Sequence, residues 1–447
     1  MKNKNLKILS IGFASAMFFV AGCSTAAAAS TSYPPVMTQA IGRDEAAASG
    51  NAAFTTATGT SSAAATATSY DTAFSARDLS GEYDASEAVR IKLNGNSASC
   101  TAQGVSISGS TVTISAEGTY ILSGKLTGSV IVDAAKEDKI QLVLNGAEIE
   151  SDDFAAIYVK QADKVFVTLA DGTTNRLSNG GTFIQVDDNE VDAVVFAKDD
   201  LTFNGTGSLS ISSPGGHGIS GKDEVTIASG SYEITASDHA IRAKDSLAIA
   251  DGTFRISAGK DGLHAENGDD DTLGSIYITG GDFTIKVSDD AIHANTLLQI
   301  DGGTFNITGA EGLEAAYIRI NDGSVSITAS DDGVNAARKS TAYTPTFEMN
   351  GGMLTIKMGS GDTDGVDSNG NLIINGGTID VTGQSAFDYD GTATYNGGTI
   401  IINGQKSTGI PSRQMMGQRG AMGHGIETRG KTGIDLLLID KNGKIKI

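Results

Sequence analysis

The chain has 447 residues, with 32 Lys and Arg against 53 Asp and Glu, so its formal charge is −21 at pH 7. A surface this acidic repels phosphate backbones, which excludes nucleic acid as a partner and favours metal ions or basic partners. The 57 glycines stand beside only 5 prolines and follow no three-residue period, which excludes collagen, and 39% hydrophobic content is too high for wholesale disorder. The glycines therefore indicate many turns.

Residues 1–22 have the pattern of an export signal. Three lysines precede an apolar run over 8–21 that is too short to span a membrane comfortably, and small residues lead into Cys23. This ending resembles a bacterial lipobox, so we predict a lipoprotein signal peptide over 1–22, lipidation of Cys23, and an exported protein anchored to the membrane at the cell surface. An ordinary signal peptide with a chance cysteine, or an anchor helix, is the alternative. Loss of the three lysines would bring the charge to −24.

Residues 23–80 are rich in Ala, Ser and Thr, which predicts a flexible tether between the membrane and a folded body. With Cys23 lipidated, Cys100 has no partner for an intramolecular disulfide. We expect Cys100 to be a small buried residue.

One pattern recurs from about residue 190 onward: an acid, a small residue, an apolar residue, a variable residue, and Ala or Ser. The clear copies start at Asp261, Asp290, Glu311, Asp332 and Asp364, and weaker copies start at Asp192, His217, His239 and Ser385. The steps between starts are 25, 22, 22, 29, 21, 21, 32 and 21 residues. A period of 21–22 residues with insertions at two places is typical of a solenoid.

Each copy continues with apolar residues that alternate with polar ones around an Asn-Gly or Asp-Gly pair, as in 298–307 and 372–381. Alternation rich in Val, Ile and Thr predicts short strands with one buried face, and the glycine pairs supply positive φ at the corners. Hairpins are the alternative, because Asn-Gly also favours a tight hairpin turn, but hairpins do not explain the recurrence. We predict an all-β fold, a single-stranded parallel β-helix with coils of about 21–22 residues.

The flanks of this pattern set the predicted domain limits. Residues 91–185 show the same strand chemistry with a less regular period, which indicates atypical first coils that cap the solenoid. We place the β-helix over 81–404 and a Gly/Met-rich loop with a C-terminal segment over 405–447. Met415, Met416 and Met422 indicate a flexible or capping loop, with a soft-metal site such as copper as the alternative.

Two rows of polar side chains follow from the stacking of coils about 4.8 Å apart. The acids that start the clear copies lie at a bend and form one row, the acidic column: Asp261, Asp290, Glu311, Asp332 and Asp364. The apolar residue of each copy points inward and the next residue faces solvent, which forms a second row, the middle column: His264, His293, Glu314, Asn335 and Asp367.

Carboxylates at this spacing repel each other by several kcal/mol at an effective dielectric constant near 20, and one Ca²⁺ can bridge two of them. We therefore predict Ca²⁺ as a cofactor, with candidate ligands in the acidic column, at Glu314 and Asp367, and at the flanking Asp289 and Asp331. For a single acid, a hydrogen bond from a backbone N–H at the bend is the alternative. His264 and His293 also raise the possibility of zinc, but two histidines without a third N or S ligand are more typical of surface residues.

The chain resembles the bacterial carbohydrate-binding β-helix proteins first described in a cellulose-degrading clostridium. The resemblance covers about 85–405 and rests on the repeat copies and on three stretches: Gly118–Leu126, Leu142–Gly146 and Lys164–Asn175. That family is similar in fold to calcium-dependent pectate lyases and is associated with binding of cellulose and polygalacturonate. The resemblance implies a right-handed β-helix over 81–404 that binds carbohydrate at the cell surface, with calcium bound.

We therefore expect a monomer that binds an extracellular polysaccharide, either pectin, polygalacturonate or a cellulose-like chain, without catalysis. His264, His293, Asn335 and Tyr389 are the candidate sugar contacts. The main alternative is a calcium-dependent polyuronate lyase, in which Lys260 or Arg242 beside the acidic column would remove the α-proton. A structural or adhesive surface stalk is a further alternative. Because the surface is acidic, binding of polygalacturonate should require calcium.

Overall fold

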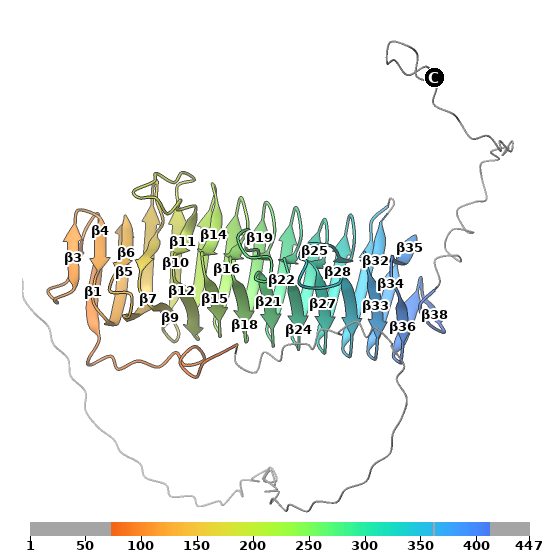
Figure 1. The fold of residues 1–447 in the computed structure, drawn as a ribbon. Coiled ribbons are helices and arrows are strands. Elements are labelled where there is room, and N and C mark those ends of the chain that lie inside the picture. The colour runs from red at the N-terminus through yellow and green to blue at the C-terminus, as the bar shows by residue number, and fades with distance from the viewer. Residues whose placement is uncertain (1–72, 361–362, 412–447) are drawn as a thin grey trace, which may run out of the picture. The chain divides into compact units, whose positions relative to one another are not determined.

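The computed structural model describes residues 73–360 and 363–411. The predicted signal peptide, Cys23, most of the predicted tether and the three C-terminal methionines lie outside these residues. The described part of the chain is all-β and contains no helix, so it offers none that could cross a membrane. Figure 1 shows the strands lying side by side in chain order, from β1 (Val89–Gly95) to β38 (Gln405–Ser407).

Most strands belong to three ladders in which each strand pairs in parallel with the corresponding strand of the next repeat. The first ladder contains β7 (Lys139–Ser151), β9 (Lys164–Leu169), β12 (Asp200–Gly205), β15 (Glu224–Ile227), β18 (Ser246–Ile249), β21 (Ser275–Ile278), β24 (Leu297–Ile300), β27 (Tyr317–Ile320), β30 (Thr346–Met349), β33 (Asn371–Ile374) and β36 (Ala393–Tyr395). The second ladder also starts at β7, whose two halves pair separately, and continues through β10 (Thr174–Asn179), β13 (Ser208–Ser213), β16 (Ser231–Ala236), β19 (Thr253–Ala258), β22 (Asp282–Val287), β25 (Thr304–Gly309), β28 (Ser324–Ala329), β31 (Met353–Met358), β34 (Thr378–Thr382) and β37 (Thr399–Ile402).

The third ladder forms its own sheet and carries the repeat starts. It contains β3 (Val105–Ser108), β4 (Thr111–Ile114), β6 (Ser129–Asp133), β8 (Ile157–Gln161), β11 (Ala193–Ala197), β14 (His217–Gly221), β17 (Ile241–Ala243), β20 (Leu263–Ala265), β23 (Ile292–Ala294), β26 (Leu313–Ala315), β29 (Val334–Ala336), β32 (Asp364–Ser368) and β35 (Ser385–Tyr389). At the N-terminal end, β5 (Gly118–Thr127) pairs with β1 and β7. The antiparallel pairs are β1 with β2 (Ala98–Ser99), β3 with β4, and β37 with β38.

The register of the third ladder confirms the predicted alignment of the repeat. Leu263 pairs with Ile292, and Leu313 pairs with Val334, so the apolar residues stack in one buried row. His264 pairs with His293 in the same register, which places the middle column on the opposite face of the strands.

Aromatic rings stack through the interior behind the second ladder. Tyr232, Phe254, Phe283 and Phe305 come from four consecutive strands, and all are at most 2% exposed. Ring centroids are 4.5 Å apart between Phe254 and Phe283 and again between Phe283 and Phe305. The corner before each of these strands is tight: Gly303 has a φ of 101°, and a Cβ there would lie 2.9 Å from the carbonyl oxygen of Gly281.

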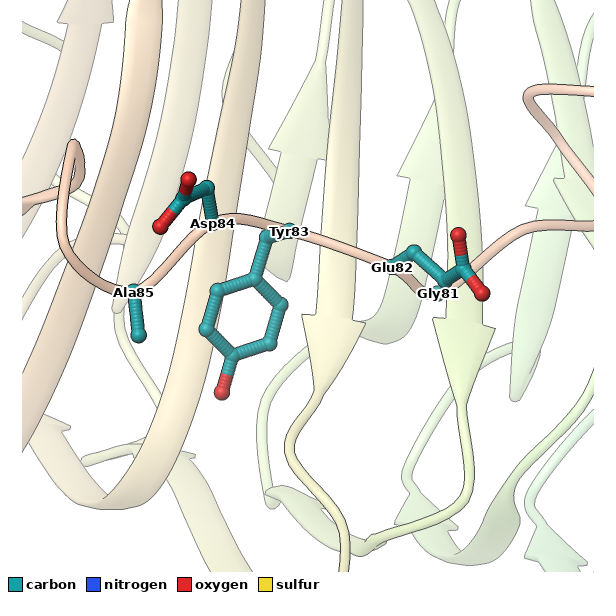
Figure 2. Close-up of a pocket in the computed structure, with 5 residues that line it drawn as sticks. All are labelled: Gly81, Glu82, Tyr83, Asp84 and Ala85. Carbon is teal, nitrogen blue, oxygen red and sulfur yellow. The ribbon is translucent and has the colours of Figure 1, made fainter.

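An extended segment precedes β1 and lies against the outer face of the first ladder. Figure 2 shows Gly81–Ala85 crossing the strands, with Tyr83 at its centre. The Gln141 side-chain amide donates to the Glu82 carbonyl at 3.2 Å, and Asp78 forms an ion pair with Lys164 at 2.9 Å. Residues 73–80, part of the predicted tether, therefore pack on the sheet. The pocket along Gly81–Ala85 is bounded by one continuous segment, so it brings together no side chains from separate repeats.

A second row of acids, which the sequence analysis did not identify, lies at the corner before the first ladder. Asp199, Asp223 and Asp245 come from three consecutive repeats, and each directly precedes the first-ladder strand of its repeat, β12, β15 and β18 respectively. Burial, followed by the charges of Asp200 and Asp245, raises the pKa of Asp223 to about 6. The folded chain therefore holds a proton on Asp223 more tightly than the unfolded chain, whose Asp223 keeps its ordinary pKa of 3.8.

This shift predicts how Asp223→Asn changes stability with pH. The contribution of protonated Asp223 is fully present below pH 3.8 and is lost as the pH rises through about 6, where the ionised carboxylate destabilises the fold. We expect the variant to be more stable than the parent chain at pH 8 by about 1 kcal/mol, after allowance for solvent screening, and equal to it near pH 4. Urea unfolding at both pH values measures this. Asp188→Asn, the same change at an exposed carboxylate, should have no such effect; a pH-independent gain for Asp223→Asn would refute the argument.

Candidate functional site

Ionisable side chains from five consecutive repeats meet in one hollow of about 370 Å³ beside the third ladder. It is lined by His239, Lys260, Asp261, His264, Asp289, Asp290, His293, Glu311, Glu314 and Lys339. The hollow thus combines the first half of the acidic column with the first half of the middle column. It lies at the bends where each chain segment enters a third-ladder strand, which is why residues three apart in sequence face each other across it.

Two inserted loops, 266–273 and 337–345, flank this hollow, and each lengthens the repeat that contains it. The two loops contact one another although they are far apart in sequence. The Ser340 hydroxyl donates to the Asp271 carbonyl oxygen at 2.5 Å, and the Thr341 N–H donates to the Asp271 carboxylate at 2.6 Å. The second loop places Lys339 Nζ 2.9 Å from Glu314 Oε2. The insertions therefore supply a wall and a cation to the site.

The acids of the first loop are engaged in local contacts. Asp269 forms an ion pair with Lys244, and Asp270 accepts hydrogen bonds from the backbone N–H and hydroxyl of Thr272. The side-chain oxygen of Asn267 accepts hydrogen bonds from the backbone N–H groups of Asp269 and Asp270, which closes the turn. The loop shapes the rim of the hollow through these contacts.

Asp261 and its two neighbouring histidines form the first cluster in the hollow. The Asp261 Oδ2 atom lies 2.6 Å from His264 Nδ1 and 3.2 Å from His239 Nδ1, and Oδ1 accepts the Asp290 N–H at 3.1 Å. Burial alone would raise the pKa of Asp261, but the two histidines hold that pKa well below its ordinary value. Burial lowers the pKa of His264, so this imidazole is neutral near pH 7.

Asp290, Glu311 and Glu314 form the second cluster, one repeat further along. Their carboxylate oxygens lie within 4.8 Å of one another. His293 Nδ1 lies 2.9 Å from Asp290 Oδ2 and 3.0 Å from Glu314 Oε2, and these contacts outweigh burial and raise the pKa of His293 to about 10. Burial, followed by the charges of Glu314 and Asp290, raises the pKa of Glu311 to about 8. With Glu311 protonated, His293 and Lys339 balance the two other carboxylates, and ionisation of Glu311 would leave one negative charge without a counter-charge.

The rest of the two columns continues beyond the hollow. Asp332 Oδ1 accepts a hydrogen bond from the Asp364 N–H at 2.8 Å, and Asp261 Oδ1 accepts one from the Asp290 N–H in the same way. The alternative prediction, in which an acid at the bend accepts a backbone N–H, therefore describes one oxygen of Asp332 and one of Asp261. Burial and the charges of Asp332, Asp364 and Asp388 raise the pKa of Asp367 to about 6. Asp289 lies at the rim of the hollow, whereas Asp331 is exposed outside it.

The middle column differs from the prediction in its exposure. It points away from the apolar interior as expected, but the prediction that it faces solvent is wrong for His264 and Glu314, which are 6% and 5% exposed. The neighbouring columns and Lys339 cover them. Asn335 is half-buried, and its amide donates to both Glu311 oxygens at 3.1 and 3.2 Å.

Tyr389 lies elsewhere than predicted. It pairs with Ser368, which itself pairs with Ala336, so Tyr389 occupies the inward row that holds Ala336 two repeats earlier, and its ring packs against the apolar core. A role as a sugar-stacking platform conflicts with this placement. The misassignment arose because the last repeat carries a large residue where earlier repeats carry alanine or serine.

The two candidate bases differ in position. Lys260 lines the hollow, and its Nζ lies 2.8 Å from Asp238 Oδ1. Arg242 belongs to the middle column one repeat before His264, and it lies 3.6 Å from Asp192 Oδ2, outside the lining of the hollow. Only Lys260 of the pair can therefore contact a ligand placed in the hollow.

Three residues in or beside the hollow escaped the sequence analysis. His217 and His239 start the weaker repeat copies, so they occupy acidic-column positions, and this was a signal that the sequence contained. Lys339 lies in an insertion, outside any repeat, and its approach to Glu314 has no sequence signal.

Comparisons with known proteins identify the family of the chain. A family model for carbohydrate-binding domain-containing proteins matches residues 108–365 and 309–409, which together span more than half of the chain. The chain belongs to this family. A carbohydrate-binding domain-containing protein of Acetivibrio thermocellus is 38% identical over 208 residues, which cover 46% of this chain and 73% of the relative. Among solved structures, the polysaccharide lyase-like protein from C. thermocellum is 23% identical, with a TM-score of 0.43 over 70% of this chain and 96% of that one.

Proposed function

We propose that the chain is a membrane-anchored, exported lipoprotein whose body, a right-handed parallel β-helix, binds an acidic polysaccharide without catalysis and with the help of calcium. Membership of the carbohydrate-binding family supports the polysaccharide. The three ladders of parallel strands and the 21–22-residue repeat support the β-helix. The observation that carries the proposal is the hollow, in which clustered carboxylates lie beside two lysines.

The residues of the second cluster fit calcium. Asp290, Glu311 and Glu314 offer only oxygen donors, which Ca²⁺ prefers, and their oxygens are close enough to share one ion. Without an ion, burial and repulsion from the neighbouring acids raise the pKa of Glu311 to about 8, so its carboxyl group keeps a proton at pH 7. A divalent cation would replace that proton and remove the repulsion. Asp332, Asp364 and Asp367 continue the rows of oxygen donors at lower burial, and the charges of the first two help to raise the pKa of Asp367 to about 6.

The lysines favour an anionic sugar as the ligand. Lys260 and Lys339 come from different repeats and both line the hollow. Lys260 forms an ion pair with Asp238, and Lys339 forms one with Glu314. A uronate carboxylate that entered the hollow could contact these ammonium groups and the calcium together. Because the chain carries a net charge of −21, a polyuronate approaching without calcium would be repelled.

Retention on a polyuronate gel tests the proposal. The full chain should be retained when calcium is present and released by a chelator, whereas magnesium, which demands a tight octahedral shell, should replace calcium poorly. A neutral cellulose gel in parallel shows whether the carboxylates of the polymer are needed. Retention that persists in the chelator would contradict the calcium requirement, and failure of every polymer to bind would favour the surface stalk.

Polyuronate elimination is the second candidate function, and the position of Lys260 favours it. A lysine beside a calcium-bound uronate could remove the α-proton while the ion stabilises the charge that develops on the carboxylate. The ion pair with Asp238 opposes this role, because it holds Lys260 Nζ against a carboxylate of the protein and not against a ligand. Ultraviolet absorbance of the unsaturated product separates the two functions: binding alone gives no rise, and a rise that Lys260→Ala abolishes would establish a lyase.

A further inference from the structure

Four of the five histidines in the sequence lie in one continuous stack at the start of the hollow. The ring centroids are 5.1 Å apart between His217 and His239, 4.1 Å between His239 and His264, and 4.8 Å between His264 and His293. They come from four consecutive repeats of the third ladder. A structural stack needs only ring packing, so the donor atoms around these rings decide whether the stack has a further role.

His239 and His264 enclose a carboxylate that supplies a third ligand atom. Nδ1 of His239 lies 3.2 Å from Asp261 Oδ2, and Nδ1 of His264 lies 2.6 Å from the same oxygen. His239, Asp261 and His264 are 9%, 3% and 6% exposed, so this is the one candidate ligand group among the described residues in which all three members are buried. Ligand atoms that share a zinc ion at 2.0–2.1 Å lie roughly 3 Å apart, which these distances approach.

The contacts of His239 leave an unmet interaction at this point. Its Nδ1 accepts the backbone N–H of Asp261 at 3.3 Å, and the Nδ1 that accepts this bond has no proton to donate to Asp261 Oδ2 at 3.2 Å. A single Nδ1 can accept from the N–H or donate to the carboxylate but cannot do both, so one of these two buried contacts is always unmet. A cation bound by Nδ1 and Oδ2 would give both atoms a favourable contact.

The donor set determines the class of cation. Two imidazole nitrogens and one carboxylate oxygen suit a divalent first-row transition metal, whereas calcium selects oxygen ligands alone. We propose that His239, Asp261 and His264 bind one such ion, distinct from the calcium proposed at Asp290, Glu311 and Glu314. Three protein ligands leave further coordination positions for water or for a hydroxyl group of a bound sugar.

Zinc titration of the full chain in excess calcium tests this site. We expect one zinc ion per chain that calcium does not displace. Cobalt in place of zinc should give visible absorption bands of a nitrogen-ligated ion. The absence of zinc binding, or its displacement by calcium, would overturn the proposal.

Matched variants separate this site from the proposed calcium site. His239→Gln and His264→Gln should each weaken zinc binding by about 100-fold, and Asp261→Asn should do the same without removing an aromatic ring from the stack. Glu311→Gln should leave zinc binding unchanged. Circular dichroism verifies that each variant is folded. Equal zinc affinity in the parent chain and the folded Asp261→Asn and His264→Gln variants would place the ion elsewhere and refute the assignment, whatever the result of polysaccharide binding.

Discussion

Replacing Phe283 with alanine should lower the free energy of unfolding by about 4 kcal/mol. The ring is 2% exposed and lies between two parallel rings, with centroids 4.5 Å away on either side. Because coils contact only their neighbours in a repeat protein, the interior on either side of Phe283 cannot collapse into the gap without moving two other strands. The cavity should therefore remain, and the variant should lose both the apolar burial and the two ring contacts.

Urea unfolding followed by circular dichroism measures this loss. Met353→Ala is the matched control, because Met353 lies in the same ladder but its side chain is exposed, so that variant should change stability by less than about 0.5 kcal/mol. Phe283→Leu should fall between the two. A loss for Phe283→Ala no larger than for Met353→Ala would show that the ring stack contributes little to the fold.

Much of the fold follows from the repeat, because a constant coil length fixes which residues become neighbours. Once Leu263 and Ile292 are aligned, the pairing of His264 with His293 and the stacking of Asp261 near Asp290 are geometric consequences. The inward alanines of the third ladder follow in the same way, and Ala265 and Ala294 are fully buried. Sequence reasoning therefore predicted which residues share a row.

What the repeat could not reveal is the environment of each row. Burial of His264 and Glu314 depends on Lys339 and on the contact between two insertions, and no periodic pattern encodes a contact between Asp271 and Thr341. The inward placement of Tyr389 shows the same limit. The register predicts that an inward row exists, but it does not predict which residue of the last repeat lies in that row. Aperiodic segments determine these details by side-chain contacts that form only in the folded chain.

The two clusters of the hollow differ because the residues in equivalent positions change along the columns. The acidic column carries His239 and then Asp261, Asp290 and Glu311, while the middle column changes from histidine to Glu314 after His293. Nitrogen donors therefore dominate at one end and oxygen donors at the other. One backbone geometry thus presents two ligand sets with different metal preferences, and a variant in one cluster can be tested without altering the donors of the other.

Glu311→Gln is accordingly expected to reduce calcium-dependent retention on polyuronate by about 100-fold, to the level seen in a chelator. Glutamine keeps the shape of the protonated side chain and removes the charge that a cation would bind, so the fold should tolerate it. Because burial and neighbouring acids raise the pKa of Glu311 to about 8, the parent side chain is largely protonated at pH 7 without metal. The melting temperature of the metal-free variant should therefore not fall, whereas the rise that calcium gives the parent chain should disappear.

Glu233→Gln controls for the change in net charge, since Glu233 is exposed on β16 in the second ladder and away from the hollow. Retention of that variant should match the parent chain. If Glu311→Gln binds polyuronate as the parent does and still gains stability from calcium, the ion lies outside the second cluster. The row of Asp332, Asp364 and Asp367 is then the next candidate to test for calcium, and the hollow must hold sugar through its lysines and histidines alone.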